Sequence, residues 1–138
     1  MRKAIVAGNW KMHKTTSEAV ELVAALKPLL AGVEVEAAVC PPFTSLQAVH
    51  AALEGSAIGL GAQNMHCEGE GAFTGEVSAE MILAAGCTYV ILGHSERRQY
   101  GGETDEMVNR KLVRALAAGL RPTGKYSGAV SWAAADHS

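Results

Sequence analysis

Residues 89–98 read Tyr-Val-Ile-Leu-Gly-His-Ser-Glu-Arg-Arg, an apolar segment followed at once by titratable side chains. The first four residues predict a buried β-strand, because three of them are β-branched or aromatic. After Gly93 come a histidine, a hydroxyl, a carboxylate and two guanidinium groups. In α/β proteins the carboxyl edge of a parallel sheet is where chemistry is commonly placed. Taken alone, an arbitrary strand end of this kind is more simply explained as a solvated turn.

The amino terminus follows the same pattern. Residues 4–12 read Ala-Ile-Val-Ala-Gly-Asn-Trp-Lys-Met, a short apolar strand that ends in the amide of Asn9 and the ammonium of Lys11. The carboxyl ends of parallel strands meet at one edge of their sheet. Two strand ends with polar chemistry therefore favour a shared site over an incidental turn.

Two further motifs, Cys-Pro-Pro at 40–42 and Gly-Ala-Phe-Thr-Gly-Glu at 71–76, precede Gly-His-Ser-Glu-Arg-Arg at 93–98 along the chain. Together with the amino-terminal segment, these motifs make the chain resemble triosephosphate isomerase, in register from Arg2 to about Pro122. The resemblance implies an α/β fold of the (β/α)₈ TIM barrel family, which needs about 250 residues. Residues 1–122 would be the amino-terminal half of that barrel, with only its first four βα units.

Hydrophobic periodicity independently predicts a repeated strand–helix unit. The strands are expected at about 3–8, 33–40, 58–62 and 88–92, and the main helices at about 15–30, 45–53, 78–85 and 104–118. Two glycines in the third strand are expected where the sheet bends or packs closely. This pattern alone does not separate an open doubly wound sheet from part of a barrel, and the resemblance favours the barrel.

Composition indicates a cytoplasmic protein with one compact core, since 49% of the 138 residues are hydrophobic. The net charge of −2 gives no reason to expect a nucleic acid or an anionic membrane as partner. No signal peptide or membrane-spanning run is expected either. The three cysteines, Cys40, Cys67 and Cys87, are odd in number and lack CxxC spacing, so neither a disulfide framework nor a metal site is predicted. The resemblance implies no cofactor.

Residues 123–138 differ in character from the rest of the chain. They contain no four-residue apolar run, and they do not match the family's fifth strand, although residues 120–122 stand where that strand should begin. We expect an irregular, non-matching tail. A frameshift, a truncation or a fused foreign end would each produce such a change, and the loss of the match in the middle of a unit favours a frameshift. A natural short relative with its own tail is the remaining alternative.

The resemblance also implies roles for three residues at the two strand ends. Lys11 would attract the substrate phosphate and stabilise the developing enediolate. Asn9 would donate an amide hydrogen bond to the same oxygen, although a turn cap is its simpler role. His94 would be the neutral electrophile, because the amino end of a short following helix disfavours its imidazolium form. The proton-abstracting glutamate, the lid and the glycine-rich phosphate loops of the family all lie beyond Pro122.

Four more residues are expected to support this site. Glu96 lies close to it, but by the resemblance it is not the catalytic base and supports the electrophilic side. Arg97 and Glu76 are expected to be structural, with the guanidinium pairing with a carboxylate from the neighbouring loop. Ser95 is expected to cap the short helix, or otherwise to bond His94.

The segment 63–75 is too long and too glycine-rich for an ordinary βα connection. By the resemblance it inserts into a second subunit of a homodimer, with Met65, Phe73 and Thr74 at the interface and Thr74 near the partner's site. A solvated rim loop is the alternative.

The expected function is therefore that of the isomerase family, which interconverts glyceraldehyde 3-phosphate and dihydroxyacetone phosphate in glycolysis and gluconeogenesis. Because the base is absent from this chain, we expect it to be inactive alone. A non-catalytic half-barrel that binds phosphorylated trioses or a partner chain is the alternative. An unrelated α/β binding module is disfavoured by the ordered motifs.

Overall fold

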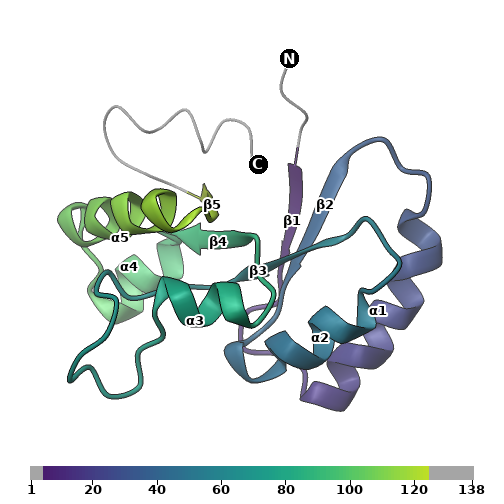
Figure 1. Cartoon of the computed structure of the whole chain (residues 1–138), viewed down its shortest axis with the longest axis horizontal. Helices are drawn as coiled ribbons and strands as arrows, with labels where there is room; N and C mark the ends of the chain where they lie inside the picture. Colours follow the sequence, from purple (N-terminus) through teal and green to yellow (C-terminus); the bar gives the residue numbers. More distant parts are fainter. Residues whose placement is uncertain (1–4, 125–138) are drawn as a thin grey trace.

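A computed structural model describes residues 5–124 of the chain, in which strands and helices alternate (Figure 1). The elements are β1 (Ile5–Asn9), α1 (Thr16–Leu30), β2 (Glu36–Cys40), a short 3₁₀ helix η1 (Phe43–Ser45), α2 (Leu46–Ala52), β3 (Gly59–Ala62), α3 (Ala79–Ala84), β4 (Tyr89–Leu92), α4 (Ser95–Gly101), α5 (Asp105–Ala118) and β5 (Arg121–Gly124). The four predicted βα units are confirmed. Strand β2 is shorter than expected and begins only at Glu36.

The five strands form one parallel sheet in the order β1-β2-β3-β4-β5. Each strand therefore pairs with its neighbour in the sequence, as consecutive βα units of a barrel wall do. In Figure 1, β1 and β2 stand steeply while β4 lies almost across them, so the sheet curls strongly from one edge to the other. The structure is half of a barrel wall with its helices on the outside.

Strand β5 is an addition to the four units that the sequence predicts. It pairs in parallel with β4, with Val90 opposite Pro122 and Leu92 opposite Gly124. The strand thus continues two residues past Pro122, where the expected tail begins. Strand β5 forms through backbone hydrogen bonds to its neighbour. Residues 121–124 contain no apolar run, so hydrophobic periodicity could not predict this strand. Residues 125–138 of the expected tail lie outside the described part of the chain.

The helix boundaries follow from their caps. Thr15 and Glu18 form the reciprocal capping box that starts α1. The side chain of Thr104 accepts a hydrogen bond from the backbone N–H of Met107 at the start of α5. Gly119, with φ +94°, ends that helix in the left-handed conformation. These caps confirm the ends that the sequence predicts for α1 and α5.

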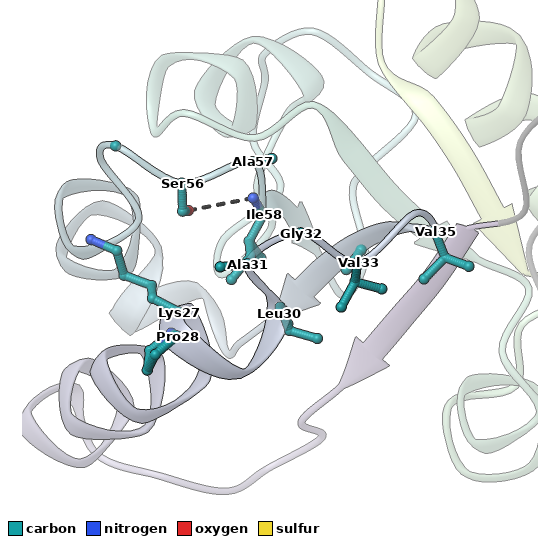
Figure 2. A pocket seen from close by; sticks show the side chains of 12 residues that line it. Lys27, Pro28, Leu30, Ala31, Gly32, Val33, Val35, Ser56, Ala57 and Ile58 are labelled. Atoms are coloured by element: carbon teal, nitrogen blue, oxygen red, sulfur yellow. Dashed lines mark hydrogen bonds between the residues drawn. The ribbon is translucent and has the colours of Figure 1, made fainter.

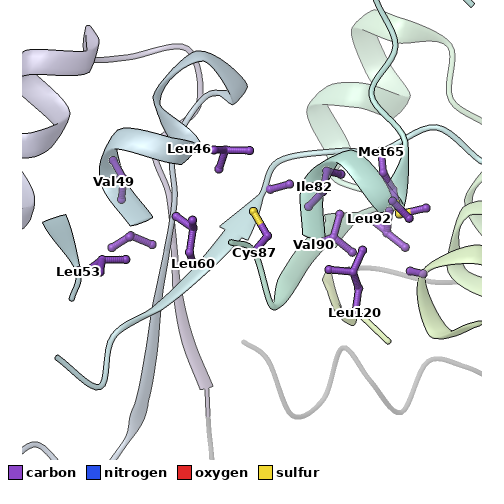
Figure 3. Close-up of a cluster of buried hydrophobic side chains, with 14 of the residues drawn as sticks. Leu46, Val49, Leu53, Leu60, Met65, Ile82, Cys87, Val90, Leu92 and Leu120 are labelled. Atoms are coloured by element: carbon purple, nitrogen blue, oxygen red, sulfur yellow. The ribbon is translucent and has the colours of Figure 1, made fainter. Parts of the chain in front are cut away.

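The main core lies between the outer face of the sheet and the helices, as Figure 3 shows. Alternate strand residues face it, among them Val39, Leu60, Val90 and Leu92. Helix residues that close it include Val23, Val49, Ile82, Val108 and Leu112. Cys40 and Cys87 are buried as small core residues, and burial raises the pKa of both thiols to about 12.

A second, smaller cluster of Ile5, Ala38 and Tyr89 lies on the opposite face of the same strands. The Tyr89 ring passes over β3, because that strand has glycine at both positions beneath it. A Cβ on Gly59 would lie 2.6 Å from Tyr89 Cε2, and one on Gly61 would lie 2.7 Å from Cys40 Sγ. The expectation that these glycines mark close packing is confirmed.

Replacing Gly61 with Ala should lower the free energy of unfolding by about 1–3 kcal/mol, the usual cost of overpacking a tight core. The added methyl would meet both Cys40 Sγ and the Tyr89 side chain. The matched control is Gly101→Ala, since Gly101 is helical and only Arg97 Nη2, at 3.9 Å, comes near its Cβ position. Urea unfolding of both variants measures the difference; equal stability of Gly61→Ala and Gly101→Ala would contradict it.

A hollow of about 470 Å³ lies at the amino ends of β2 and β3, between the last turn of α1 and the loop before β3 (Figure 2). Its lining is mostly aliphatic. The ammonium of Lys27 at its rim donates to the backbone carbonyl of Glu54. This hollow is therefore remote from the polar strand ends. None of the helices within residues 5–124 has the length and apolar character to cross a membrane.

Candidate functional site at the carboxyl ends of the strands

The curl of the sheet brings together residues that follow β1 and β4. Lys11 lies two residues after β1, and His94 and Glu96 follow β4. Two strands separate β1 from β4 in the sheet. Even so, Lys11 Nζ lies 2.9 Å from Glu96 Oε2. The convergence of an ammonium, a carboxylate and an imidazole that the sequence predicts at this edge is present in the structure.

Lys11 has an unusual backbone, with φ +57° in a residue that carries a Cβ. Its N–H donates to the side-chain oxygen Oδ1 of Asn9 at 2.9 Å, which forms a local turn. Asn9 therefore does act as a turn cap. This role uses only its oxygen, so it is compatible with donation from its NH₂ group to a ligand.

His94 is the N-cap of α4, so its ring lies at the amino end of that helix as the sequence predicts. Its Nδ1 accepts a hydrogen bond from the backbone N–H of Glu96 at 3.1 Å. Glu96 Oε1 is farther from the same nitrogen, at 3.5 Å. An Nδ1 that accepts a hydrogen bond carries no proton, so the proton of the neutral ring is on Nε2. The histidine can thus act as a donor through Nε2.

The structure corrects the role expected for Ser95. Ser95 is the first residue of α4 and is exposed, whereas the cap is made by the preceding His94. The chain leaves β4 through Gly93, at φ +70°. The imidazole nitrogen of His94 then accepts the hydrogen bond that a serine oxygen accepts in many helix caps.

Glu96 is held as a carboxylate. A hydrogen bond from Lys11 and the positive charge of that ammonium lower the pKa of Glu96, although partial desolvation opposes the shift. The side chains of Lys11 and Glu96 are 50% and 42% exposed. An exposed pair of this kind contributes little stability, so the ammonium can exchange this carboxylate for a ligand anion.

The structure also corrects the partner of Arg97. Its Nε donates to Glu103 Oε2 at 3.2 Å, and Glu103 comes from the loop between α4 and α5. Glu76 is exposed, and its backbone N–H donates a hydrogen bond to the carbonyl oxygen of Phe73. Glu103 lies two residues beyond the end of α4, the helix that carries Arg97.

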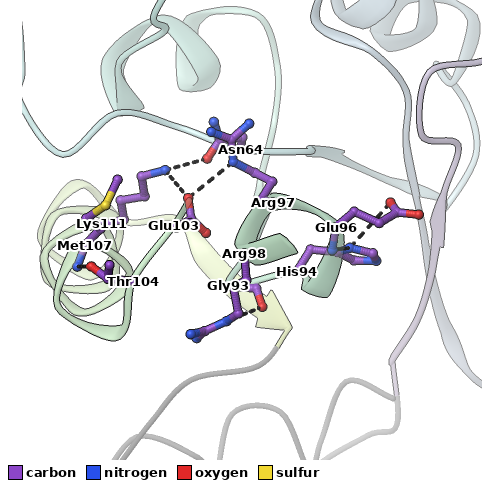
Figure 4. A network of polar contacts seen from close by, with 10 residues as sticks. All are labelled: Asn64, Gly93, His94, Glu96, Arg97, Arg98, Glu103, Thr104, Met107 and Lys111. Carbon is purple, nitrogen blue, oxygen red and sulfur yellow. Dashed lines mark hydrogen bonds and ion pairs between the residues drawn. The ribbon is translucent and has the colours of Figure 1, made fainter. Parts of the chain in front are cut away.

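Glu103 belongs to a buried polar cluster that the sequence did not reveal (Figure 4). Lys111 Nζ lies 2.5 Å from Glu103 Oε2 and 2.9 Å from Asn64 Oδ1. Burial opposes ionisation of Glu103, but hydrogen bonds and charge from Lys111 and then Arg97 outweigh it and lower its pKa. The helical spacing of Lys111 could have indicated its burial, because Lys111 lies on the same buried face of α5 as Val108 and Ala115.

Arg98 holds the turn between β4 and α4. Its Nε donates to the carbonyl oxygen of Gly93 at 3.0 Å, and its Nη1 lies 2.5 Å from Asp105 Oδ1. Figure 4 shows the contact between Arg98 and Gly93. Through Asp105, the residue before His94 is thus connected to the start of α5.

Of the three residues expected at a subunit interface, Met65 lies in the core instead. Its side chain is 0% exposed and packs within the main core of its own chain. Its apolar character therefore serves folding and not association. Phe73 is exposed and stacks on His66, with ring centroids 4.2 Å apart, and Thr74 is exposed beside it.

No group of three or more His, Cys, Asp or Glu side chains within residues 5–124 is arranged to hold a metal ion. The polar groups at the strand ends are instead an ammonium, an amide and an imidazole N–H, which suit an anionic or carbonyl-bearing ligand.

Comparison with known proteins identifies the family. The triosephosphate isomerase family model matches residues 4–123. The triosephosphate isomerases of Endomicrobium trichonymphae and Chloroflexus aurantiacus are each 60% identical, over 123 and 126 residues. That of Carboxydothermus hydrogenoformans is also 60% identical, over 126 residues. Each match covers 88% of this chain and 49% of the relative, so the chain spans about half the length of the curated relatives it matches. The chain therefore belongs to the triosephosphate isomerase family.

Proposed function

We propose that this chain supplies the electrophilic and phosphate-binding half of a triosephosphate isomerase site, for which Lys11, Asn9 and His94 provide the groups. The observation that carries the proposal is the convergence of Lys11 and His94 on Glu96 from strands that are not neighbours. The proposed reaction is the interconversion of glyceraldehyde 3-phosphate and dihydroxyacetone phosphate.

Each residue has a defined part in the proposed chemistry. Lys11 exchanges Glu96 for the substrate phosphate and stabilises negative charge on the enediolate oxygen. His94 donates from Nε2 to that oxygen, since its Nδ1 already accepts from Glu96 N–H. Asn9 donates from its NH₂ group to the same oxygen. Glu96 positions Lys11 in the free site. It is not the proposed base, because the family's proton-abstracting glutamate follows the sixth strand.

The 138 residues alone are proposed not to turn over substrate. In the family, the glutamate that abstracts the carbon-bound proton follows the sixth strand, and β5 is the last strand among the described residues. A general base contributes roughly 10²–10⁴ in rate. The lid and the phosphate loops of the family add binding energy that is realised in the transition state.

The purified 138-residue chain should therefore show no isomerisation of glyceraldehyde 3-phosphate above that of its His94→Ala variant. A coupled assay that follows dihydroxyacetone phosphate measures this directly. A kcat/KM within the ordinary enzyme range of about 10⁴–10⁸ M⁻¹s⁻¹ would mean that a base is present within these residues. Binding of the triose phosphate without turnover would instead favour the non-catalytic half-barrel.

We further propose that the complete enzyme is a cytoplasmic homodimer in which Phe73 and Thr74 contact the partner subunit. In support, Phe73 is 43% exposed in a loop that carries no helix or strand.

In a full-length chimera, Thr74→Asp should shift sedimentation toward the monomer and lower activity together, since it places a charge in a desolvated interface. Thr44→Asp, at another exposed threonine, is the control. A fully active, dimeric Thr74→Asp chimera would leave this segment as a rim loop.

A further inference from the structure

Gln63 connects the ends of three strands. It is the first residue after β3, and its Nε2 donates to two backbone carbonyls, that of Lys11 at 2.9 Å and that of Cys40 at 2.8 Å. Cys40 is the last residue of β2, and Lys11 follows β1. A single side-chain amide thus joins the carboxyl ends of β1, β2 and β3.

The chemistry of this contact is specific to a carboxamide. Both acceptors are carbonyl oxygens, so the NH₂ group must face them and the amide orientation is unambiguous. A glutamate of the same shape would present only lone pairs to two carbonyls at neutral pH. A methionine of similar length would present no donor at all.

The residue that Gln63 holds has an unusual backbone. Lys11 has φ +57°, a conformation that persists in a residue with a Cβ only when its surroundings hold it. Asn9 Oδ1 holds its N–H group, and Gln63 Nε2 holds its carbonyl group. These two hydrogen bonds fix the backbone of Lys11 and therefore the direction in which its side chain leaves the backbone.

We propose that Gln63 is a positioning residue that keeps Lys11 in its left-handed conformation and so directs the ammonium into the site. The inference rests on the proposed function only for what that ammonium binds. The geometry of Lys11 itself can be measured without substrate.

The test uses NMR on the 138-residue chain and its Gln63→Met variant. In the variant, the Lys11 amide hydrogen should exchange at least tenfold faster than in the wild type, because the turn that protects it loses one of its two supports. The titration of the Glu96 carboxyl should move up toward its ordinary pKa as the Lys11 ammonium moves away. Amides of Val39 and Val90, in the core strands, should keep their protection.

Two further variants make the result decisive. Gln47→Met removes an exposed glutamine from α2 and should change neither reading. Gln63→Glu should behave like Gln63→Met at neutral pH and recover part of the Lys11 protection when acid restores one O–H donor.

Two results would overturn the proposal. One is unchanged Lys11 exchange and Glu96 titration in a folded Gln63→Met chain. The other is loss of strand protection throughout both Gln63 variants, which would make Gln63 a support of the whole sheet. A failure of the proposed isomerase activity would leave these readings unaffected, so the two failures are distinguishable.

Discussion

In a completed barrel, Lys11→Met is expected to lower kcat/KM for isomerisation by about 10²–10³-fold, the usual cost of removing one preorganised group that faces developing negative charge. Methionine keeps the length of the side chain but has no charge and no donor. The loss should be kinetic and not structural. The Lys11–Glu96 pair is half exposed, so breaking it has little effect on folding.

The completed barrel is a chimera in which residues 1–122 are joined to the carboxyl-terminal half of the Endomicrobium trichonymphae enzyme, which is 60% identical over the shared half. The matched control is Lys14→Met. Lys14 is exposed and also has a positive φ, of +76°, so methionine meets the same backbone demand there. Steady-state kinetics should show Lys14→Met near the parent rate. If Lys11→Met also keeps that rate, the role proposed for Lys11 is wrong.

The fold could be predicted from sequence because its determinants are local. Apolar runs such as 89–92 indicate buried strands, and Thr15, Thr104 and Gly119 mark helix ends through contacts within a few residues. Strand β5 was harder to detect, since it depends on pairing with β4 and not on its own composition.

The sequence predicted which strand ends form the site, but it did not predict which side chains pair with one another there. Lys11 and His94 approach the same carboxylate, that of Glu96, because parallel strands share one carboxyl edge. Arg97 pairs with Glu103 instead of Glu76, and nothing in the spacing distinguishes those two carboxylates. Met65 is apolar for the core and not for an interface, a distinction that depends on which way a loop residue points.

Lys111→Met is expected to destabilise the fold by about 3–5 kcal/mol, because it leaves the Glu103 carboxylate buried without its closest cation. The side chains of Lys111 and Glu103 are only 5% and 1% exposed. Glu103 Oε1 is already buried without a hydrogen-bond partner in the described structure, so little else can compensate. Arg97 is the remaining cation, and its side chain is 40% exposed.

Two comparisons separate the buried pair from charge in general. Arg110→Met, on the same helix, breaks an exposed contact with Glu68 and should cost at most about 1 kcal/mol. In the double variant Glu103→Gln, Lys111→Met the unpaired charge is gone, so part of the stability should return. Chemical unfolding of the four proteins measures all three differences. Equal losses in Lys111→Met and Arg110→Met would show that Glu103 does not depend on Lys111.

The pH dependence of stability tests the Lys111–Glu103 pair independently. The folded-state pKa of Glu103 is below its unfolded value, so its contribution is complete above about pH 4.3 and is lost as the pH falls through the folded-state pKa. In Lys111→Met, burial without the lysine should raise that pKa, so protonation at low pH relieves the unpaired charge. The stability gap between wild type and Lys111→Met should therefore narrow as the pH is lowered. A gap that stays constant through this range would mean that the loss comes from packing and not from the carboxylate, because methionine packing does not titrate.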